Sequence, residues 1–302
     1  MSKSTKTARA RAEQARLARE RVAARGRRLR TAWWSIVAWP ALIALFALIN
    51  VSLPDATGPA GPTGALPPAV AAALNVDPST LDSVGRGQAT GLPQALSDAP
   101  ALLEGDKPLV LYVGADYCPF CAAQRWALVV ALNRFGTFTD LSTSYSARDD
   151  VFPGTATLSF HGSTYSSPYL AFDGVEVATS ERGADGRYEP LDQLTPEQEA
   201  VVQTYNAPPY VSAQSAGAIP FIDFGNQFLM SGSAFSPSLL AGLSHEQIAA
   251  AVADNPSGAL AQALLGSANA FTAVLCQLTG GEPANVCTSP AATAYQQEVT
   301  NG

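Results

Sequence analysis

An apolar run at residues 109–113 is the clearest strand pattern in the chain, and an alanine- and leucine-rich stretch at residues 122–132 follows it. The short run of Leu, Val and Tyr favours a buried strand, and the longer stretch of good helix formers favours a helix. Between them lies Cys118-Pro119-Phe120-Cys121. The pattern therefore predicts a strand, a cysteine-bearing turn and a helix, in that order.

Three further patterns predict strands, at residues 138–145, 156–161 and 169–177. The first is expected to lie parallel to the strand at 109–113, because a strand–helix–strand unit of this length forms a right-handed crossover. The turn-forming pair Asp173-Gly174 is expected to fold residues 169–177 into a hairpin or a bulge.

Two capping patterns mark helix starts in the C-terminal half. Thr195 and Ser244 each stand three residues before a glutamine, which is the arrangement of a capping box. They predict helices at residues 195–205 and 244–254. The remaining expected elements are a strand at 219–224, a tight turn at Gly225-Asn226 and an apolar helix at 258–278.

Charge divides the chain into a basic tail and an acidic remainder. Residues 1–30 carry 11 of the 18 Lys and Arg residues and 2 of the 25 Asp and Glu residues, a net +9, which leaves −16 for the rest of the −7 chain. Residues 31–53 contain no charge and include three of the four tryptophans. Such a segment is long enough to cross a bilayer, with its tryptophans at the interface. By the positive-inside rule the N-terminus lies in the cytoplasm and the rest of the chain outside.

A cleaved signal peptide is the competing interpretation of residues 31–53. The basic region is long for a signal peptide, and no Ala-x-Ala cleavage site follows directly. We therefore expect a single-pass protein of the cell membrane. Its parts are a basic cytoplasmic tail (1–30), a transmembrane anchor (31–53), a Pro/Gly-rich linker and lead-in (54–104) and an extracytoplasmic domain (105–302). The acidic domain argues against nucleic-acid binding.

The chain has four cysteines, an even number that suits an oxidising compartment. Cys276 and Cys287 bracket a turn-rich segment and are expected to form a structural disulfide. Cys118 and Cys121 stand at the predicted helix start, where unpaired backbone N–H groups favour a thiolate. A zinc site using all four cysteines is an alternative, but the spacing of the second pair does not suit it. We expect no metal and no other cofactor.

The thiolate is the nucleophile of thiol–disulfide exchange, so Cys118 is the expected attacking group and Cys121 the resolving one. An inert Cys118–Cys121 disulfide in a non-catalytic, membrane-tethered interaction module is the alternative. His161, His245 and Trp126 are expected to have structural roles.

The order strand, Cys-x-x-Cys helix, strand, helix, proline-led strand, hairpin and helix resembles the thioredoxin fold, an α/β fold with a mixed sheet. The resemblance covers about residues 105–280, with an insertion around 147–194, and its specific elements are Cys118-Pro119-Phe120-Cys121 and Ala218-Ile219-Pro220-Phe221. It implies that Pro220 is cis and faces the two sulfurs. It also implies that the backbone of Ile219 pairs with an extended substrate. For Tyr117, an aromatic residue just before the site, contact with the substrate and simple packing are the two alternatives.

More narrowly, three segments resemble a prokaryotic thioredoxin-like family catalogued as domain of unknown function 929. They are Gly114–Cys121, Ser144-Tyr145-Ser146 and the strand at 157–162. The family name carries no activity, so the chemistry must come from the residues.

One position departs from ordinary thioredoxins, which have a buried aspartate six residues before the first cysteine. Tyr112 stands there in this chain. Asp116 is expected to be exposed at the rim of the site, so the sequence indicates no buried general base.

These patterns together predict a membrane-anchored, extracytoplasmic thiol–disulfide oxidoreductase. Its expected partners are exported proteins with thiols or disulfides, the membrane and a redox partner that the sequence does not identify.

Overall fold

The computed structural model describes residues 64–301. Its helices are α2 (Pro68–Leu74), α3 (Pro78–Val84), α4 (Pro119–Leu132), α5 (Pro196–Tyr205), η1 (Pro237–Leu240, a 3₁₀ helix), α6 (His245–Asp254), α7 (Ala259–Leu278), α8 (Ala284–Cys287) and α9 (Pro290–Asn301).

Its strands include six that form the central sheet: β2 (Gln94–Ala95), β3 (Leu103–Glu104), β4 (Lys107–Gly114), β9 (Ala171–Glu176), β12 (Phe221–Phe224) and β13 (Phe228–Ser231). The others form small separate sheets: β1 (Gly64–Ala65), β5 (Thr137–Thr139), β6 (Ser142–Tyr145), β7 (Ala156–Ser159), β8 (Thr164–Ser166), β10 (Ala178–Arg182) and β11 (Tyr188–Pro190).

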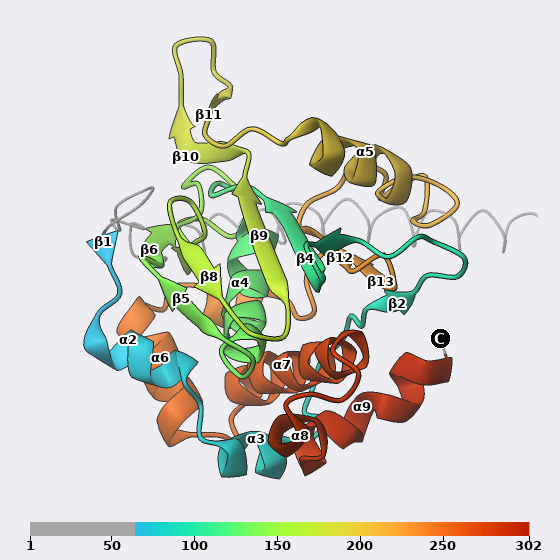
Figure 1. The fold of residues 1–302 in the computed structure, drawn as a ribbon. Coiled ribbons are helices and arrows are strands. Elements are labelled where there is room, and N and C mark those ends of the chain that lie inside the picture. The colour runs from blue at the N-terminus through green and yellow to red at the C-terminus, as the bar shows by residue number, and fades with distance from the viewer. Residues whose placement is uncertain (1–63, 302) are drawn as a thin grey trace, which may run out of the picture. The chain divides into compact units, whose positions relative to one another are not determined.

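The central sheet is mixed and is built around β4 (Figure 1). On one side β4 pairs antiparallel with β12, which continues to β13 and β2; on the other it pairs parallel with β9. The short strand β3 pairs with the first residues of β4. The predicted α/β class with a mixed sheet is therefore confirmed.

The parallel neighbour of β4 differs from the predicted one. Residues 138–145 do not form one strand, because Asp140 has a left-handed backbone (φ +59°) that separates β5 from β6. Both short strands pair antiparallel with other short strands, outside the central sheet. The parallel strand is β9, so residues 147–194 are not simply an insertion: they contain a central strand.

The hairpin or bulge predicted at Asp173-Gly174 is also wrong. These residues lie in the uninterrupted ladder of β9 against β4, opposite Leu111 and Tyr112. A Cβ at Gly174 would lie 2.6 Å from the Cβ of Phe160. Glycine is used here for close side-chain approach to a strand and not for a turn.

The locally encoded elements agree with their predictions. Capping boxes at Thr195 and Ser244 open α5 and α6. The β12–β13 hairpin turns at Gly225 (φ +66°) and Asn226 (φ +54°), where two successive positive φ values make the tight turn that suits strand twist.

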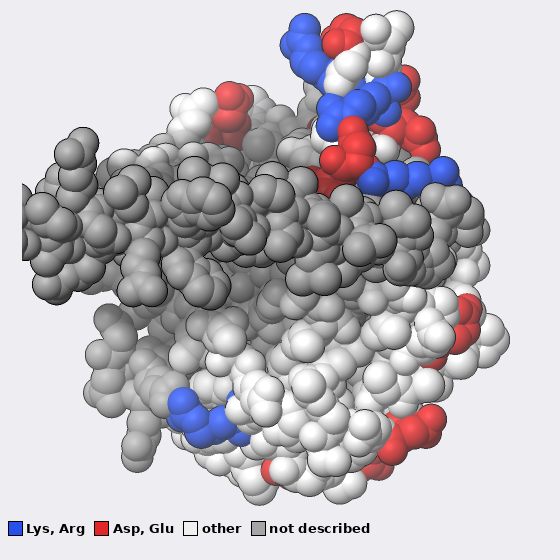
Figure 2. Space-filling model, turned by 180° about the vertical axis from the view of Figure 1, so that it is seen from behind, with Lys and Arg blue, Asp and Glu red and all other residues white. Residues whose placement is uncertain are grey.

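The β10–β11 hairpin projects from the fold beyond the end of β9 (Figure 1). Five charged residues lie on it: Glu181, Arg182, Asp185, Arg187 and Glu189. From behind, charge gathers on this projection, whereas the described surface below it is mostly uncharged (Figure 2).

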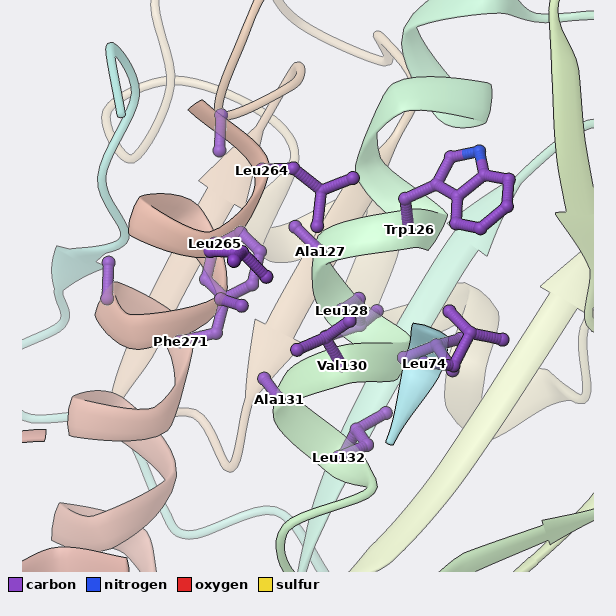
Figure 3. Close-up of a cluster of buried hydrophobic side chains, with 14 of the residues drawn as sticks. Leu74, Trp126, Ala127, Leu128, Val130, Ala131, Leu132, Leu264, Leu265 and Phe271 are labelled. Carbon is purple, nitrogen blue, oxygen red and sulfur yellow. The ribbon is translucent and has the colours of Figure 1, made fainter. Parts of the chain in front are cut away.

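The two faces of the sheet carry separate cores. Val110 and Tyr112 of β4 join a large cluster with α4 and α7, whereas Leu111 and Val113 join a smaller cluster with α5. This follows from the two-residue alternation of side chains along a strand. Helices α4 and α7 lie side by side with apolar side chains between them (Figure 3). Thirteen of the 14 residues of α4 are buried, so the helix that carries the two cysteines is held from all sides.

Residues of the lead-in segment share the large core. Leu74 of α2 and Leu81 of α3 are buried in it. Helix α2 packs on α6, and α3 packs on α7 and α9. The described part of residues 54–104 is therefore an integral layer of the fold.

A disulfide joins Cys276, near the end of α7, to Cys287, at the end of α8. It is the pair that the sequence analysis named as structural. Closing a loop with a sequence separation of 11 residues contributes about 2–3 kcal/mol in the chain-entropy description.

Within the described residues one helix, α7, has the length and apolar composition of a membrane span, and 83% of its most apolar window is buried inside the fold. A core helix meets the same criteria, which accounts for α7. The predicted anchor at residues 31–53 lies outside the described residues.

Candidate redox site

The loop between β4 and α4 places Cys118 at the N-cap of the helix. Its backbone is extended (φ −81°, ψ 119°), and its sulfur accepts a hydrogen bond from the backbone N–H of Cys121 at 3.3 Å. Pro119 occupies the first helical position, where its fixed φ fits and no N–H is needed. The local sequence thus aims one sulfur at the positive end of the helix.

The two thiols are unequal. Both are free; Cys118 is 6% exposed and Cys121 is fully buried. The hydrogen bonds that the Cys121 thiol and backbone donate to the Cys118 sulfur lower the pKa of Cys118, against the effect of burial. Burial raises the pKa of Cys121 well above its ordinary value. Cys118 is therefore the thiol that ionises more readily, and the thiolate is the reactive form of a cysteine.

The segment before β12 forms the wall opposite Cys118. The Ile219–Pro220 peptide is cis, and the Cys118 thiol points at the Ile219 carbonyl oxygen at 3.9 Å. The β12–β4 ladder, in which Phe221 lies opposite Val113, holds these distant segments together. The structure thus brings together Cys118, Ile219 and Pro220.

Tyr117, the possible substrate contact, is half-covered by another ring. It stacks on Tyr188 of β11 with centroids 4.1 Å apart and planes 5° apart. Arg182 lies over the other side of that ring at 4.0 Å and pairs with Asp149 at 2.6 Å. The projecting hairpin is in this way fixed beside the residue that precedes Cys118.

Phe120 is the exposed member of the Cys-x-x-Cys segment, with 40% of its surface accessible. Its ring and that of Phe152 are T-shaped to each other, with centroids 6.1 Å apart. Val151, which precedes Phe152, is 67% exposed. An apolar rim therefore lies next to the partly accessible sulfur.

A buried ion pair lies behind the cysteines, and sequence reasoning missed it. Arg125 donates from Nε to Oε1 of Glu176 (2.7 Å) and from Nη2 to Oε2 (2.6 Å), and both side chains are 0% exposed. Nη2 also donates to the Ala115 carbonyl at 2.8 Å. Burial raises the pKa of Glu176, and the charge of Arg125 offsets part of the rise. The available signal was a lone arginine one turn after Cys121, the one charged residue of this helix.

Asp116 was predicted to be exposed at the rim of the site, but it is fully buried. It lies 3.6 Å from Arg125 Nη2. Burial raises its pKa, while the Arg125 charge opposes the rise. The prediction failed because proximity to the cysteines in sequence does not fix burial. The expectation that no buried acid exists is corrected with it: Asp116 and Glu176 are both buried acids.

The remaining residues fit structural roles. The buried His245 has its Nε2 within 2.7 Å of the Thr157 carbonyl oxygen, and Trp126 Nε1 donates to the Ala156 carbonyl at 3.1 Å. His161 pairs with Asp192 at 2.6 Å. The Cys276–Cys287 bond removes two thiolates from the four-cysteine zinc alternative, and no group of His, Cys, Asp and Glu in the described residues has the arrangement of a metal site.

Alkylation of Cys118 by iodoacetamide in the full chain should reach its half-maximal rate below about pH 8.5, the ordinary midpoint of a cysteine. The thiolate reacts, and a lowered pKa extends its presence to lower pH. In Cys121→Ala the midpoint should move up, because the donating thiol is gone. A midpoint at or above about 8.5 in the unaltered chain would contradict the prediction.

Comparison with known proteins identifies a family that matches this chain. A family model described as domain of unknown function (DUF929) matches residues 97–277, more than half of the chain. The curated proteins and the solved structures contain no match. The matched range includes both free cysteines, Pro220 and the buried ion pair.

Proposed function

We propose that this chain, which belongs to the DUF929 family, exchanges thiols and disulfides through Cys118 and Cys121. The observation that carries the proposal is the asymmetry of the pair. One sulfur is partly accessible, capped onto a helix N-terminus and lowered in pKa, and the other is buried and raised in pKa. An inert structural disulfide requires no such difference.

The fold supports this chemistry. The strand order β13-β12-β4-β9, with β9 parallel to β4, β12 antiparallel and the cysteine helix directly after β4, is the arrangement expected of a thioredoxin-like domain. The proline-led strand β12 stands where such a domain places its facing wall. We assign the thioredoxin-like fold on these grounds.

The exchange would run in two steps. The Cys118 thiolate attacks a substrate disulfide, whose S–S bond breaks; one substrate sulfur leaves as a thiolate and takes up a proton, and the other is joined to Cys118. Cys121 then loses its proton and attacks Cys118 Sγ, which releases the second substrate thiolate and forms the Cys118–Cys121 disulfide. Two electrons pass from the cysteine pair to the substrate. A separate redox partner restores the dithiol, and the same steps in reverse oxidise a substrate.

The place of the reaction is part of the proposal. Residues 31–53 would anchor the chain in the cell membrane with the basic tail in the cytoplasm and residues 105–302 outside. The substrates would then be exported proteins with thiols or disulfides. The Ile219 backbone, beside the sulfur, would pair with an extended segment of such a substrate, and Tyr117 would contact it.

Trapping tests the proposal directly. In the full chain, Cys121→Ser leaves Cys118 able to attack but removes the thiol that resolves the product, so mixed disulfides with exported proteins should accumulate. They should disappear on reduction and be absent from the double variant Cys118→Ser/Cys121→Ser. If no adduct forms, and the native Cys118–Cys121 disulfide has a reduction potential below about −300 mV, typical of structural disulfides, the proposal fails.

A further inference from the structure

Tyr112 occupies the part of β4 that lies directly beneath the cysteine helix. Its side chain belongs to the core cluster shared with α4 and is 0% exposed. The hydroxyl turns toward the end of the strand: a Cβ built on Gly114 would lie 2.2 Å from it. Because Gly114 has no side chain, the hydroxyl has room at the start of the loop that carries Cys118.

The hydroxyl group of Tyr112 has no hydrogen-bond partner among the described residues. A buried hydroxyl without a partner is costly, and such groups in native structures call for an explanation. Phenylalanine at this position would fill the same space without this cost. The hydroxyl therefore makes the fold less stable than phenylalanine would, which indicates that it has a functional role.

Arg125 lies near the Tyr112 ring. Its guanidinium carbon lies 5.9 Å from the centre of the Tyr112 ring. It stands one turn after Cys121 in α4 and reaches back to the Ala115 carbonyl. Hydroxyl and guanidinium therefore lie next to Gly114 and Ala115, under the segment that leads into Cys118 and Cys121.

We infer that the Tyr112 hydroxyl donates a hydrogen bond to the Cys121 sulfur as that sulfur becomes a thiolate. In this way it supports the resolving step in place of the buried carboxylate that the sequence lacks at this position. The inference rests on the proposed exchange function and adds the residue that makes its second step possible.

The electrostatics agree with a donor role. Burial raises the pKa of Tyr112 well above its ordinary value, and the nearby Cys121 and Cys118 raise it further, although Arg125 opposes them. The phenol therefore keeps its proton at neutral pH. It can donate a hydrogen bond, but it cannot take up a proton from Cys121. It is a positioned donor for a charged sulfur and not a general base.

The proton balance needs no base on Tyr112. The Cys121 proton is lost as its sulfur attacks Cys118 Sγ, the bond from Cys118 to the substrate sulfur breaks, and the departing substrate thiolate takes up one proton from solvent. Tyr112 keeps its own proton throughout. The Arg125 charge lowers the pKa of Cys121, though less than burial raises it.

Glu176 fits the role less well. Both carboxylate oxygens of Glu176 are engaged by Arg125, which holds the group as an anion beside the site. An anion disfavours a thiolate, and Glu176 accordingly raises the pKa of Cys121. Tyr112 combines burial, a free donor and no charge.

The symmetrical disulfide of thionitrobenzoate separates the two steps in the full chain. Attack by Cys118 releases one coloured thiolate, and attack by Cys121 on the resulting mixed disulfide releases a second. Tyr112→Phe should leave the first release within about twofold and slow the second at least about tenfold, because a hydrogen bond to a charged group is lost. In Tyr112→Phe the pH at which the second release reaches half its maximal rate should move to a higher value.

Tyr165→Phe is the matched control. Tyr165 is a partly buried tyrosine whose hydroxyl donates to the Leu132 carbonyl at 2.8 Å, at the far end of α4. Its loss should affect neither release, and the thermal unfolding of both variants shows whether the fold is kept. An unchanged second release in Tyr112→Phe, or equal slowing of both releases, overturns the inference. Absence of both releases in the unaltered chain instead argues against the exchange function itself.

Discussion

Replacing Cys118 with serine is expected to abolish disulfide exchange, with a loss of at least about a thousandfold. Serine cannot form the mixed disulfide, and its hydroxyl does not ionise near neutral pH. Cys118 is also the more exposed residue of the pair, with 6% of its surface accessible against 0% for Cys121. The loss is measured as the rate at which the full chain reduces insulin with dithiothreitol as the electron donor. The readout is the turbidity of the reduced insulin.

Two variants show that the effect belongs to this sulfur. Cys121→Ser should also lose turnover, but it should keep the first attack and accumulate mixed disulfide. Cys276→Ser/Cys287→Ser removes the other pair, which is already joined in a disulfide, and should keep its exchange activity if the fold persists. Residual activity in Cys118→Ser close to that of the unaltered chain would show that exchange does not pass through Cys118.

Replacing Glu176 with glutamine is expected to lower the free energy of unfolding by up to about 3–5 kcal/mol. It removes the carboxylate that is hydrogen-bonded to the buried Arg125 and leaves only Asp116, 3.6 Å from Arg125 Nη2, as a counter-charge. The side chains of Arg125 and Glu176 are fully buried, and two hydrogen bonds of 2.6 and 2.7 Å join them. The glutamine keeps the shape but loses the charge. Urea unfolding at neutral pH, followed by circular dichroism, measures the change.

The matched control removes both charges. Arg125→Met/Glu176→Leu should recover part of the lost stability, because a buried ion pair replaced by apolar groups of similar size is often near neutral. The recovery is incomplete because Asp116 loses its neighbouring cation. The exposed pair of Arg182 and Asp149 gives the opposite comparison: Asp149→Asn should change stability little, since solvent screens that pair. A change of less than about 1 kcal/mol in Glu176→Gln would mean that Arg125 is satisfied without Glu176.

Pairing of distant strands was the main point at which prediction failed. Residues 138–145 have strand-forming composition, but Asp140 breaks the run, and their backbone groups pair with other short strands. Residues 171–176 contain an Asp-Gly pair that signals a turn in isolation, yet β4 and Phe160 hold them straight. Local propensity cannot report which strand is adjacent.

The charged groups of the site were missed for the same reason, because they too depend on contacts between distant segments. Arg125 and Glu176 stand 51 residues apart in sequence and meet only because β9 lies beside β4 and under α4. Asp116 follows the strand as an exposed loop residue would, but the fold covers it completely. Neither its burial nor the unpartnered Tyr112 hydroxyl can be inferred from neighbouring residues.

Features that depend on a few consecutive residues could be predicted from the sequence alone. These are the Cys118 helix cap, the capping boxes at Thr195 and Ser244, and the β12–β13 turn. Each follows from hydrogen bonds and φ values set within one or two turns of chain. Three features required the folded structure: the partner of β4, the burial of Asp116, and the charges and hydroxyl behind Cys121. These depend on contacts between segments tens of residues apart, which packing of the whole chain selects.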